Sequence, residues 1–291
     1  MTRPVWSGTA PAKVNLYLHV VGRREDGYHL LDSLVVFADV GDRLTLEPAE
    51  APRLTVTGPF AGAIPAGDDN LALRAVRRLA AAVGRPDGIA VTLDKRLPVA
   101  AGIGGGSADA AAVLRGLAAL WDLTPDDPRL IETAAGLGAD VPVCLAGRTA
   151  WLGGVGERLD PGPDLAGIPI LLVNPGVPLS TPDVFRARHG GFSAEARFAE
   201  ARPNLDRLCA LLAGRGNDLA AAATALAPVV ADVLAAIEAQ PGCRLARMSG
   251  SGATCFGLYA DGAAAETAAA HIAKAEPGWW VGISLASDEE V

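Results

Sequence analysis

Four glycines lie within residues 102–106, directly before a segment with helical apolar spacing. Because glycine has no side chain, the backbone N–H groups of such a loop can turn inward, and the start of a helix adds partial positive charge at the same place. Residues 97–109 therefore predict a loop that binds a polyphosphate. Ser107, at the expected helix start, can either cap the helix or present its hydroxyl to a phosphate oxygen or a magnesium ion.

Two better known glycine motifs do not fit this loop. A Walker loop requires Gly-Lys-Ser/Thr after four spacers, and no lysine follows Gly106. The Rossmann spacing would place its third glycine at Ser107, and no first strand of a βαβ unit precedes it. A tight turn without a ligand explains a glycine cluster alone about as well as a phosphate site does, so it is the helix that follows which favours phosphate.

A carboxylate and an amine are the next candidates for chemistry. Asp140 lies at a break between an expected helix and an expected short apolar strand, where a turn or cap residue is the ordinary role. Lys13 interrupts an apolar strand, where an edge or outward-facing charge is the ordinary role. In a phosphoryl-transfer site, the carboxylate can act as a base. The lysine can lower the proton affinity of a substrate hydroxyl and offset charge on the transferred group.

A second turn of small residues spans residues 248–254, with the sequence Met-Ser-Gly-Ser-Gly-Ala-Thr. A hairpin or a connecting loop accounts for it without any ligand. The functional alternative is a wall that closes over the phosphates.

Apolar periodicity and turn residues predict a mixed set of helices and strands around these loops. After Ser107, apolar residues recur at three- and four-residue spacing through Trp121, which predicts a buried helix. Helices and strands do not alternate regularly, so the fold class is α+β, with a domain boundary near residue 165. A capped helix is predicted over residues 71–83, and strands over residues 12–21, 34–40, 43–46, 53–57, 89–93, 168–173 and 255–259.

Composition excludes several classes of function. With 291 residues, 50% hydrophobic and 20% charged, the chain is long enough for two domains with cores of their own. A net charge of -8 argues against a nucleic-acid groove, because phosphate backbones attract basic surfaces. The four cysteines form no Cys-x-x-Cys pair and have no histidine at zinc spacing, so we expect reduced thiols. No export signal or membrane span is recognisable, which favours the cytoplasm.

The four segments around Lys13, residues 102–106, Asp140 and residues 248–254 occur in an order that resembles one known superfamily. It contains galactokinase, homoserine kinase, mevalonate kinase and phosphomevalonate kinase (GHMP kinases). The resemblance covers both domains and implies a two-domain GHMP-kinase-like fold with a cleft between the domains. Residues 1–165 would form the N-terminal ATP-binding domain, and residues 166–291 the C-terminal substrate-binding domain. It also implies ATP as the phosphoryl donor and Mg²⁺ bridging its phosphates.

Three strings are similar to one branch of that superfamily, namely residues 10–16, 24–30 and 137–142. Members of this branch phosphorylate the 2-hydroxyl of a cytidine diphosphate-linked methylerythritol, in the non-mevalonate pathway of isoprenoid precursor synthesis. The resemblance implies that Asp140 is the general base and Lys13 its electrostatic partner.

The same resemblance assigns the other expected contacts of the two substrates. Tyr28 would stack on the cytosine and His29 would supply hydrogen bonds, although both are also ordinary turn residues. Asn70 and Lys95 match positions near the adenine, although a helix cap and a solvated charge explain them equally well. Asp109 stands where many relatives have asparagine; it favours the helix dipole but can repel phosphate. The remaining residues carried over are Pro98, Gly102, Gly104, Gly105, Gly106, Ser107 and Ala108 for ATP, Ser107 also for the metal, and Asn15, Thr181, Phe185, Ser249, Gly250, Ser251 and Gly252 for the acceptor substrate.

Two other functions remain open. Another GHMP-type kinase, such as one acting on homoserine, would not need the pair Tyr28 and His29. A nucleotide-binding sensor without catalysis would not need Asp140 and Lys13, and a dinucleotide-dependent oxidoreductase lacks its fingerprint. A small-molecule substrate is the expected partner, without nucleic acid or membrane, and the chain is expected to act as a monomer or homodimer.

Overall fold

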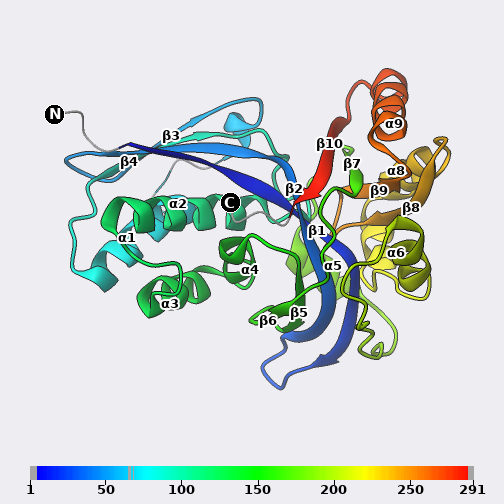
Figure 1. Cartoon of the computed structure of the whole chain (residues 1–291), viewed down its shortest axis with the longest axis horizontal. Helices are drawn as coiled ribbons and strands as arrows, with labels where there is room; N and C mark the ends of the chain where they lie inside the picture. The colour runs from blue at the N-terminus through cyan, green and yellow to red at the C-terminus, as the bar shows by residue number, and fades with distance from the viewer. Residues whose placement is uncertain (1–4, 65–66, 68, 288–291) are drawn as a thin grey trace.

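The molecule has two lobes that share one long pair of strands. A computed structural model describes residues 5–64, 67 and 69–287. Strands β1 (Trp6–Arg23) and β2 (His29–Pro48) pair antiparallel over most of their length and run from one lobe into the other (Figure 1). Residues at opposite ends of either strand therefore belong to different lobes.

The first lobe packs helices on one face of a sheet (Figure 1). Besides β1 and β2, this sheet contains β3 (Arg53–Thr57) and β4 (Ile89–Asp94), which run parallel to each other, while β4 is antiparallel to β2. Apolar side chains of the sheet and the helices form one core. The helices are the 3₁₀ turn η1 (Ala61–Ala63), α1 (Leu71–Val83), α2 (Gly105–Trp121), α3 (Pro128–Leu137) and α4 (Val141–Ala146).

The second lobe is an antiparallel sheet covered by helices. Strand β7 (Pro169–Asn174) lies between β10 (Trp280–Ser287) and β9 (Cys255–Tyr259), and β8 (Cys243–Met248) flanks β9. The end of β10 also pairs with β2, so the sheet continues from lobe to lobe. The remaining elements are β5 (Ala150–Gly154), β6 (Arg158–Pro161), α5 (Thr181–Ala187), α6 (Leu205–Leu212), α7 (Ala220–Leu226), α8 (Val229–Glu238) and α9 (Gly262–Ala275).

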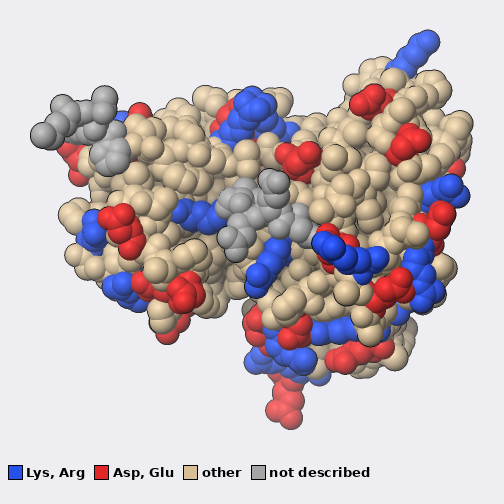
Figure 2. Space-filling view, in the orientation of Figure 1, with Lys and Arg blue, Asp and Glu red and all other residues tan. Residues whose placement is uncertain are grey.

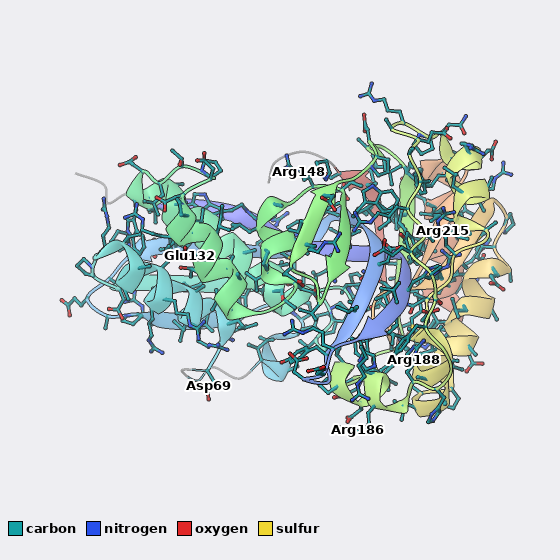
Figure 3. The ribbon with its side chains drawn as sticks, turned by 90° about the horizontal axis from the view of Figure 1, so that it is seen from below. Asp69, Glu132, Arg148, Arg186, Arg188 and Arg215 are labelled. Carbon is teal, nitrogen blue, oxygen red and sulfur yellow. The ribbon has the colours of Figure 1, made fainter. Side chains whose placement is uncertain are left out.

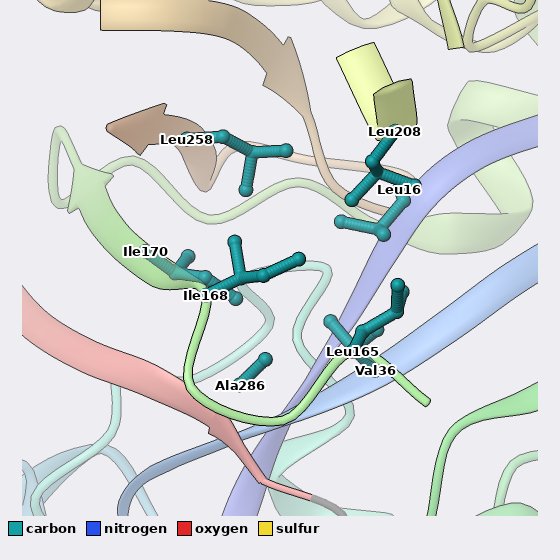
Figure 4. Close-up of a pocket in the computed structure, with 8 residues that line it drawn as sticks. All are labelled: Leu16, Val36, Leu165, Ile168, Ile170, Leu208, Leu258 and Ala286. Carbon is teal, nitrogen blue, oxygen red and sulfur yellow. The ribbon is translucent and has the colours of Figure 1, made fainter. Parts of the chain in front are cut away.

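An apolar core also joins the two lobes. It combines Leu16 of β1 and Val36 of β2 with Ile170 of β7 and Leu258 of β9, all of them buried. Eight side chains surround a small gap in this core (Figure 4). All eight are apolar, so nothing in the gap would orient a polar ligand.

The surface between the lobes is hollowed on the face shown in Figure 2. The outline is indented along its lower edge, and acidic and basic side chains are interspersed on this face (Figure 2). Each helix in the described ranges is too short or too polar to cross a bilayer.

Local sequence signals predicted several elements with their ends. Helix α1 has the predicted bounds, with Asn70 accepting a hydrogen bond from Ala72 N (2.9 Å) and Gly84 in the left-handed conformation after it (φ 67°). Strands β3 and β9 also have the predicted bounds. The four cysteines are free thiols as expected, and Cys144 and Cys255 are buried.

Two local predictions are wrong. The residues after Asp140 form α4 rather than a strand, because proline is tolerated in the first helical turn and α4 packs against α2. The two strands predicted over residues 34–46 are one strand, since Gly41 is no turn residue but allows close approach of β1, where a Cβ would overlap Ala10 O. The domain boundary near residue 165, which falls between β6 and β7, stays a prediction.

Candidate active site

The first glycine loop has a backbone conformation that glycine adopts readily. Gly102 and Gly104 have positive φ angles of 72° and 68°, and Gly104 is the N-cap of α2. Residues 105–107 form the first turn of the helix, where N–H groups have no partner within the helix. Pro98 and Ala108 are buried on either side of the loop. Unpaired N–H groups and a helix dipole are the features that an anion-binding site needs, and phosphate binding at this loop stays a prediction.

Ser107 does not cap the helix. Gly104 takes that position, and α2 has no side-chain cap, so the alternative role of Ser107 is wrong and its hydroxyl can reach a ligand. Over the residues described by the structure, no three His, Cys, Asp or Glu side chains gather into a metal site. A magnesium ion here would therefore have at most two such side chains as ligands, with the Ser107 hydroxyl, phosphate oxygens and water for the other positions.

Lys13 and Asp140 meet in space. Lys13 Nζ lies 3.0 Å from Asp140 Oδ2, with the lysine side chain 6% exposed and the aspartate side chain 40% exposed. Asp140 is the N-cap of α4 but makes no capping hydrogen bond through its side chain, and Lys13 is buried rather than outward-facing. The outward-facing role of Lys13 is therefore wrong, whereas Asp140 does lie in a turn at the start of a helix, as its ordinary role requires. Their catalytic roles stay predictions.

Lys13 lies directly against the glycine loop. Its backbone N–H donates to Ile103 O (3.0 Å). A Cβ on Gly104 would lie 3.3 Å from Lys13 Cβ and 3.4 Å from its Cε. The absence of a side chain on Gly104 thus lets the lysine pass beneath the loop to reach the carboxylate.

Asn15, two residues further along β1, carries an unsatisfied acceptor. Its backbone N–H donates to Ser249 Oγ (3.1 Å) and its Nδ2 to Ser33 Oγ (2.8 Å). Asn15 Oδ1 is buried and has no hydrogen-bond partner among the described residues. A Cβ on Gly250 would lie 3.4 Å from this oxygen. The geometry suits a positioning group that accepts a hydrogen bond from a ligand hydroxyl.

The second glycine loop, residues 249–252, interlocks with the first. A Cβ on Gly102 would lie 2.5 Å from Ser249 O, and a Cβ on Gly250 would lie 2.6 Å from Gly102 O. Ser249 Oγ also donates to Gly102 O (3.1 Å). The second glycine loop connects β8 and β9, as expected for a hairpin or a connecting loop. It also packs backbone to backbone against the first glycine loop. The two loops therefore form one continuous wall.

The residues expected around the cytosine lie at the far end of this wall. His29 stacks on Phe185 with ring centroids 5.0 Å apart and planes at 23°. Thr181 Oγ1 is 2.8 Å from Ser251 Oγ, which connects α5 to the second glycine loop. Tyr28, in the turn before β2, is 65% exposed, so its ring is open to a stacking partner. Burial, followed by the charges of two arginines, lowers the pKa of His29 below its ordinary value.

Lys95 is buried, so the alternative that it is a solvated surface charge is wrong. Its side chain is 1% exposed, and Nζ donates to Asp42 Oδ2 (2.5 Å) and Asp109 Oδ2 (2.7 Å). Asp42 Oδ1 accepts from Arg96 N (2.5 Å) and Leu97 N (2.8 Å). The triad thus ties the chain that enters the glycine loop to the helix that leaves it. Burial raises the pKa of Asp109 to about 7, although Lys95 opposes this rise.

Contacts of Asn70 and Lys95 with an adenine ring stay predictions. Asn70 is the cap of α1, and the next residue, Leu71, lies near Gly106 of the loop. The Asp109 carboxylate faces Lys95 beneath the loop, so its charge is compensated.

Two residues that hold the loops had no signal in the sequence. Asp42 lies in Gly-Asp-Arg and Asn217 in Gly-Asn-Asp, strings that are typical of ordinary turns. Nothing local indicates that either side chain points inward. Asn217 Nδ2 donates to Met248 O and Gly250 O, both at 2.8 Å.

Substituting Gly106 with alanine is expected to separate nucleotide binding from folding. A Cβ on Gly106 would meet only Leu71 Cδ1, at 3.9 Å, and alanine is the better helix former by about 1 kcal/mol. The melting temperature should therefore stay equal or rise. Because the methyl group projects from the turn that offers its N–H groups to phosphate, the KM for ATP should rise on the order of tenfold. The control is Gly278→Ala, because a Cβ at Gly278 would meet no other atom. Steady-state kinetics would measure the KM for ATP of both variants. A wild-type KM for ATP in Gly106→Ala would contradict the prediction.

A small-molecule kinase of the GHMP class is what this fold and site define, because two glycine loops from different lobes meet beside a Lys–Asp pair. The comparisons agree with this class. Residues 70–148 match the family described as GHMP kinases N terminal domain, and residues 194–277 match the family described as GHMP kinases C terminal. A crystal structure of homoserine kinase from Cytophaga hutchinsonii shares the fold at 19% identity, with a TM-score of 0.75, covering 100% of this chain and 97% of that chain.

Closer relatives define the family. The 4-diphosphocytidyl-2-C-methyl-D-erythritol kinase of Paramagnetospirillum magneticum is 57% identical over 272 residues, which cover 94% of this chain and 95% of that protein. The enzyme of the same name from Parvibaculum lavamentivorans is 51% identical over 98% of this chain and 99% of its own length. A crystal structure of 4-(cytidine 5'-diphospho)-2C-methyl-D-erythritol kinase superposes with a TM-score of 0.78 at 39% identity, covering 97% of this chain and 100% of that chain. The chain belongs to the family of 4-diphosphocytidyl-2-C-methyl-D-erythritol kinases.

Proposed function

We propose that this protein transfers the γ-phosphoryl group of ATP to the 2-hydroxyl of 4-diphosphocytidyl-2-C-methyl-D-erythritol. The observation that carries the proposal is the 3.0 Å contact between Lys13 Nζ and Asp140 Oδ2, beside a loop that ends in a helix N-terminus. Family membership supports the choice of substrates, since relatives at 51% and 57% identity carry the name of this kinase.

The Lys–Asp pair supplies the base and a positive charge. Asp140 accepts the proton of the 2-hydroxyl as the hydroxyl oxygen bonds to the γ-phosphorus. The bond from the γ-phosphorus to the bridging oxygen breaks, and its electron pair leaves with ADP. Lys13 offsets the negative charge that develops on the attacking oxygen and on the transferred group.

The glycine loop holds the donor. The N–H groups of residues 105–107 bind phosphate oxygens of ATP, and the Ser107 hydroxyl is the side chain offered to a phosphate oxygen or to the metal. When bound, Mg²⁺ neutralises charge on the β- and γ-phosphates.

The side chains of the β1–β2 turn and of α5, where His29 stacks on Phe185, bind the cytidine. Because its pKa is lowered from 6.5 by burial and by Arg23 and Arg188, His29 is neutral at pH 7 and has one donor and one acceptor nitrogen. A neutral ring can pair with the amino donor or the ring acceptor of cytosine. Tyr28 adds a stacking face.

The test is release of ADP from magnesium ATP by the purified protein. We expect turnover with 4-diphosphocytidyl-2-C-methyl-D-erythritol and none with homoserine or mevalonate. Turnover of a control substrate instead would show that the Tyr28 and His29 assignment is wrong. ATP binding without any turnover would favour the non-catalytic sensor. We further propose that the enzyme is cytoplasmic. The free cysteines support this location, since thiols persist in a reducing compartment. We also propose that it works as a monomer or homodimer.

A further inference from the structure

The side chain of Asn217 uses every hydrogen-bonding group it has to organise the second glycine loop. Its two amide protons go to Met248 O and Gly250 O, both at 2.8 Å, and its Oδ1 accepts from Leu219 N at 2.9 Å. The backbone beside Asn217 is anchored to β1, because Leu18 N donates to Gly216 O (3.0 Å). The amide therefore transmits the position of β1 to the loop.

Within the loop, the N–H groups of Ser249, Gly252 and Thr254 donate to Thr254 O, Ser249 O and Ala101 O. The peptide between Gly250 and Ser251 is held instead through Gly250 O by Asn217. Gly250 and Gly252 both have positive φ angles, 53° and 81°, so their peptides can rotate more freely than those of other residues. In a trans peptide the C=O and the following N–H point in opposite directions. When Asn217 holds Gly250 O, the N–H of Ser251 faces away from Asn217. That N–H forms no backbone hydrogen bond within the described ranges.

The position of Ser251 gives this free N–H a use. Ser251 Oγ lies 2.8 Å from Thr181 Oγ1 on the acceptor side. The neighbouring Ser249 bonds to Gly102 O on the donor side (3.1 Å). Ser251 thus lies between the first glycine loop, where we place the phosphoryl donor, and α5, where we place the acceptor.

We propose that Asn217 is a positioning residue for phosphoryl transfer, which holds the peptide of Gly250 so that the N–H of Ser251 faces the transferred group. This inference rests on the proposed function, because it takes phosphoryl transfer from ATP as the reaction. A fixed backbone donor at this place stabilises negative charge without reorganisation during the reaction. The sequence offers no hint of it, because the residues that take part are far apart along the chain.

The next residue, Asp218, holds the acceptor wall. Asp218 Oδ2 accepts from Val20 N (2.7 Å) and lies 4.0 Å from Arg188 NH2. Arg188 follows α5, the helix that carries Thr181, and its side chain is 8% exposed, whereas that of Arg186 is 75% exposed and lies at the lower edge of the molecule (Figure 3). Asn217 and Asp218 are both held against β1 near Leu18. From there, Asn217 contacts the second glycine loop and Asp218 contacts the end of α5.

Asn217→Asp is the direct test, because it keeps the shape and the bond to Leu219 N but replaces the two donors by an oxygen. We expect kcat at pH 8 to fall on the order of 10²-fold, as for loss of one oxyanion donor, with both KM values within about threefold. Protonation of the introduced carboxyl restores one donor, so the deficit relative to wild type should shrink as the pH is lowered to 6. Hydrogen exchange of residues 248–254 without substrates should be faster than in wild type.

The matched control is Asn204→Asp. Asn204 caps α6 by accepting from Arg207 N (2.9 Å), a role that aspartate fills equally well, so its kcat should equal that of wild type. Wild-type kcat in Asn217→Asp would overturn the inference, and so would a deficit that is independent of pH or that reflects only a smaller folded fraction. An inactive wild type would overturn the proposed function instead, while unchanged exchange in residues 248–254 would still overturn the loop contact.

Discussion

Asp140→Asn is expected to lower kcat by about 10²- to 10⁴-fold, the range for loss of a general base. The amide keeps the shape of the side chain but cannot accept the hydroxyl proton. The KM for ATP should change little, because Asp140 lies beside Lys13 rather than in the first turn of α2, the turn proposed to bind phosphate. The melting temperature should fall, because Lys13 is only 6% exposed and loses its ionised partner, but by less than for a fully buried pair, since the Asp140 side chain is 40% exposed.

The control for this variant is Asp127→Asn. Asp127 also precedes a helix, but its side chain caps α3 by accepting from Arg129 N (2.9 Å). Asparagine caps as well as aspartate, so the control should keep wild-type kcat. If Asp140→Asn kept kcat within tenfold of wild type, Asp140 would not be the base, and Lys13 would have to act without it.

Lys95→Met is expected to have the largest effect on stability. Removing one partner of a buried ion pair typically costs about 3–5 kcal/mol, because the remaining charge stays buried without compensation. In this variant the carboxylates of Asp42 and Asp109 would face each other without the ammonium. Urea denaturation at pH 7 should show this loss as a lower midpoint at an unchanged slope.

The pH dependence provides a second readout for Lys95→Met. Burial already raises the pKa of Asp109 to about 7, and loss of Lys95 must raise it further. A carboxyl whose folded pKa lies above its unfolded value destabilises the folded state at high pH and ceases to do so once it is protonated. The difference in free energy of unfolding between Lys95→Met and the wild type should therefore shrink as the pH falls from 8 to 5.

Two further variants complete this comparison. Lys274→Met removes an exposed lysine near the end of α9 and should cost no more than about 1 kcal/mol. Adding Asp109→Asn to Lys95→Met should restore part of the lost stability, because one buried charge is removed. A midpoint for Lys95→Met equal to that of wild type would contradict the buried triad.

Elements with strong local signals were predictable. Helix α1 has a capping asparagine before it and a glycine after it, and both act within one turn of the helix. The glycine turn that leads into α2 was predictable for the same reason, since the glycines and the helix start are contiguous. Helix α4 was not, because a six-residue apolar segment has no periodicity that separates helix from strand.

Contacts between distant segments were beyond local reasoning. Lys95 has the appearance of a surface charge in the sequence, yet the turn at Asp42 and the helix at Asp109 bury it. The local sequence gives a residue's type and its neighbours along the chain. Whether its side chain is buried depends on which distant segments pack against it. The same holds for Asn217, whose partners lie in a loop formed by residues 248–250.

The order of residues along the chain already indicates the chemical groups of this protein: two glycine turns, a carboxylate at a break and a lysine in a strand, in an order that resembles one kinase family. The contact of Lys13 with Asp140 and the packing of Gly102 against Gly250 appear only in the folded molecule. The physical reason is that residue types and short-range spacing act within a few residues. The close packing of two lobes around β1 and β2 places the functional groups against one another.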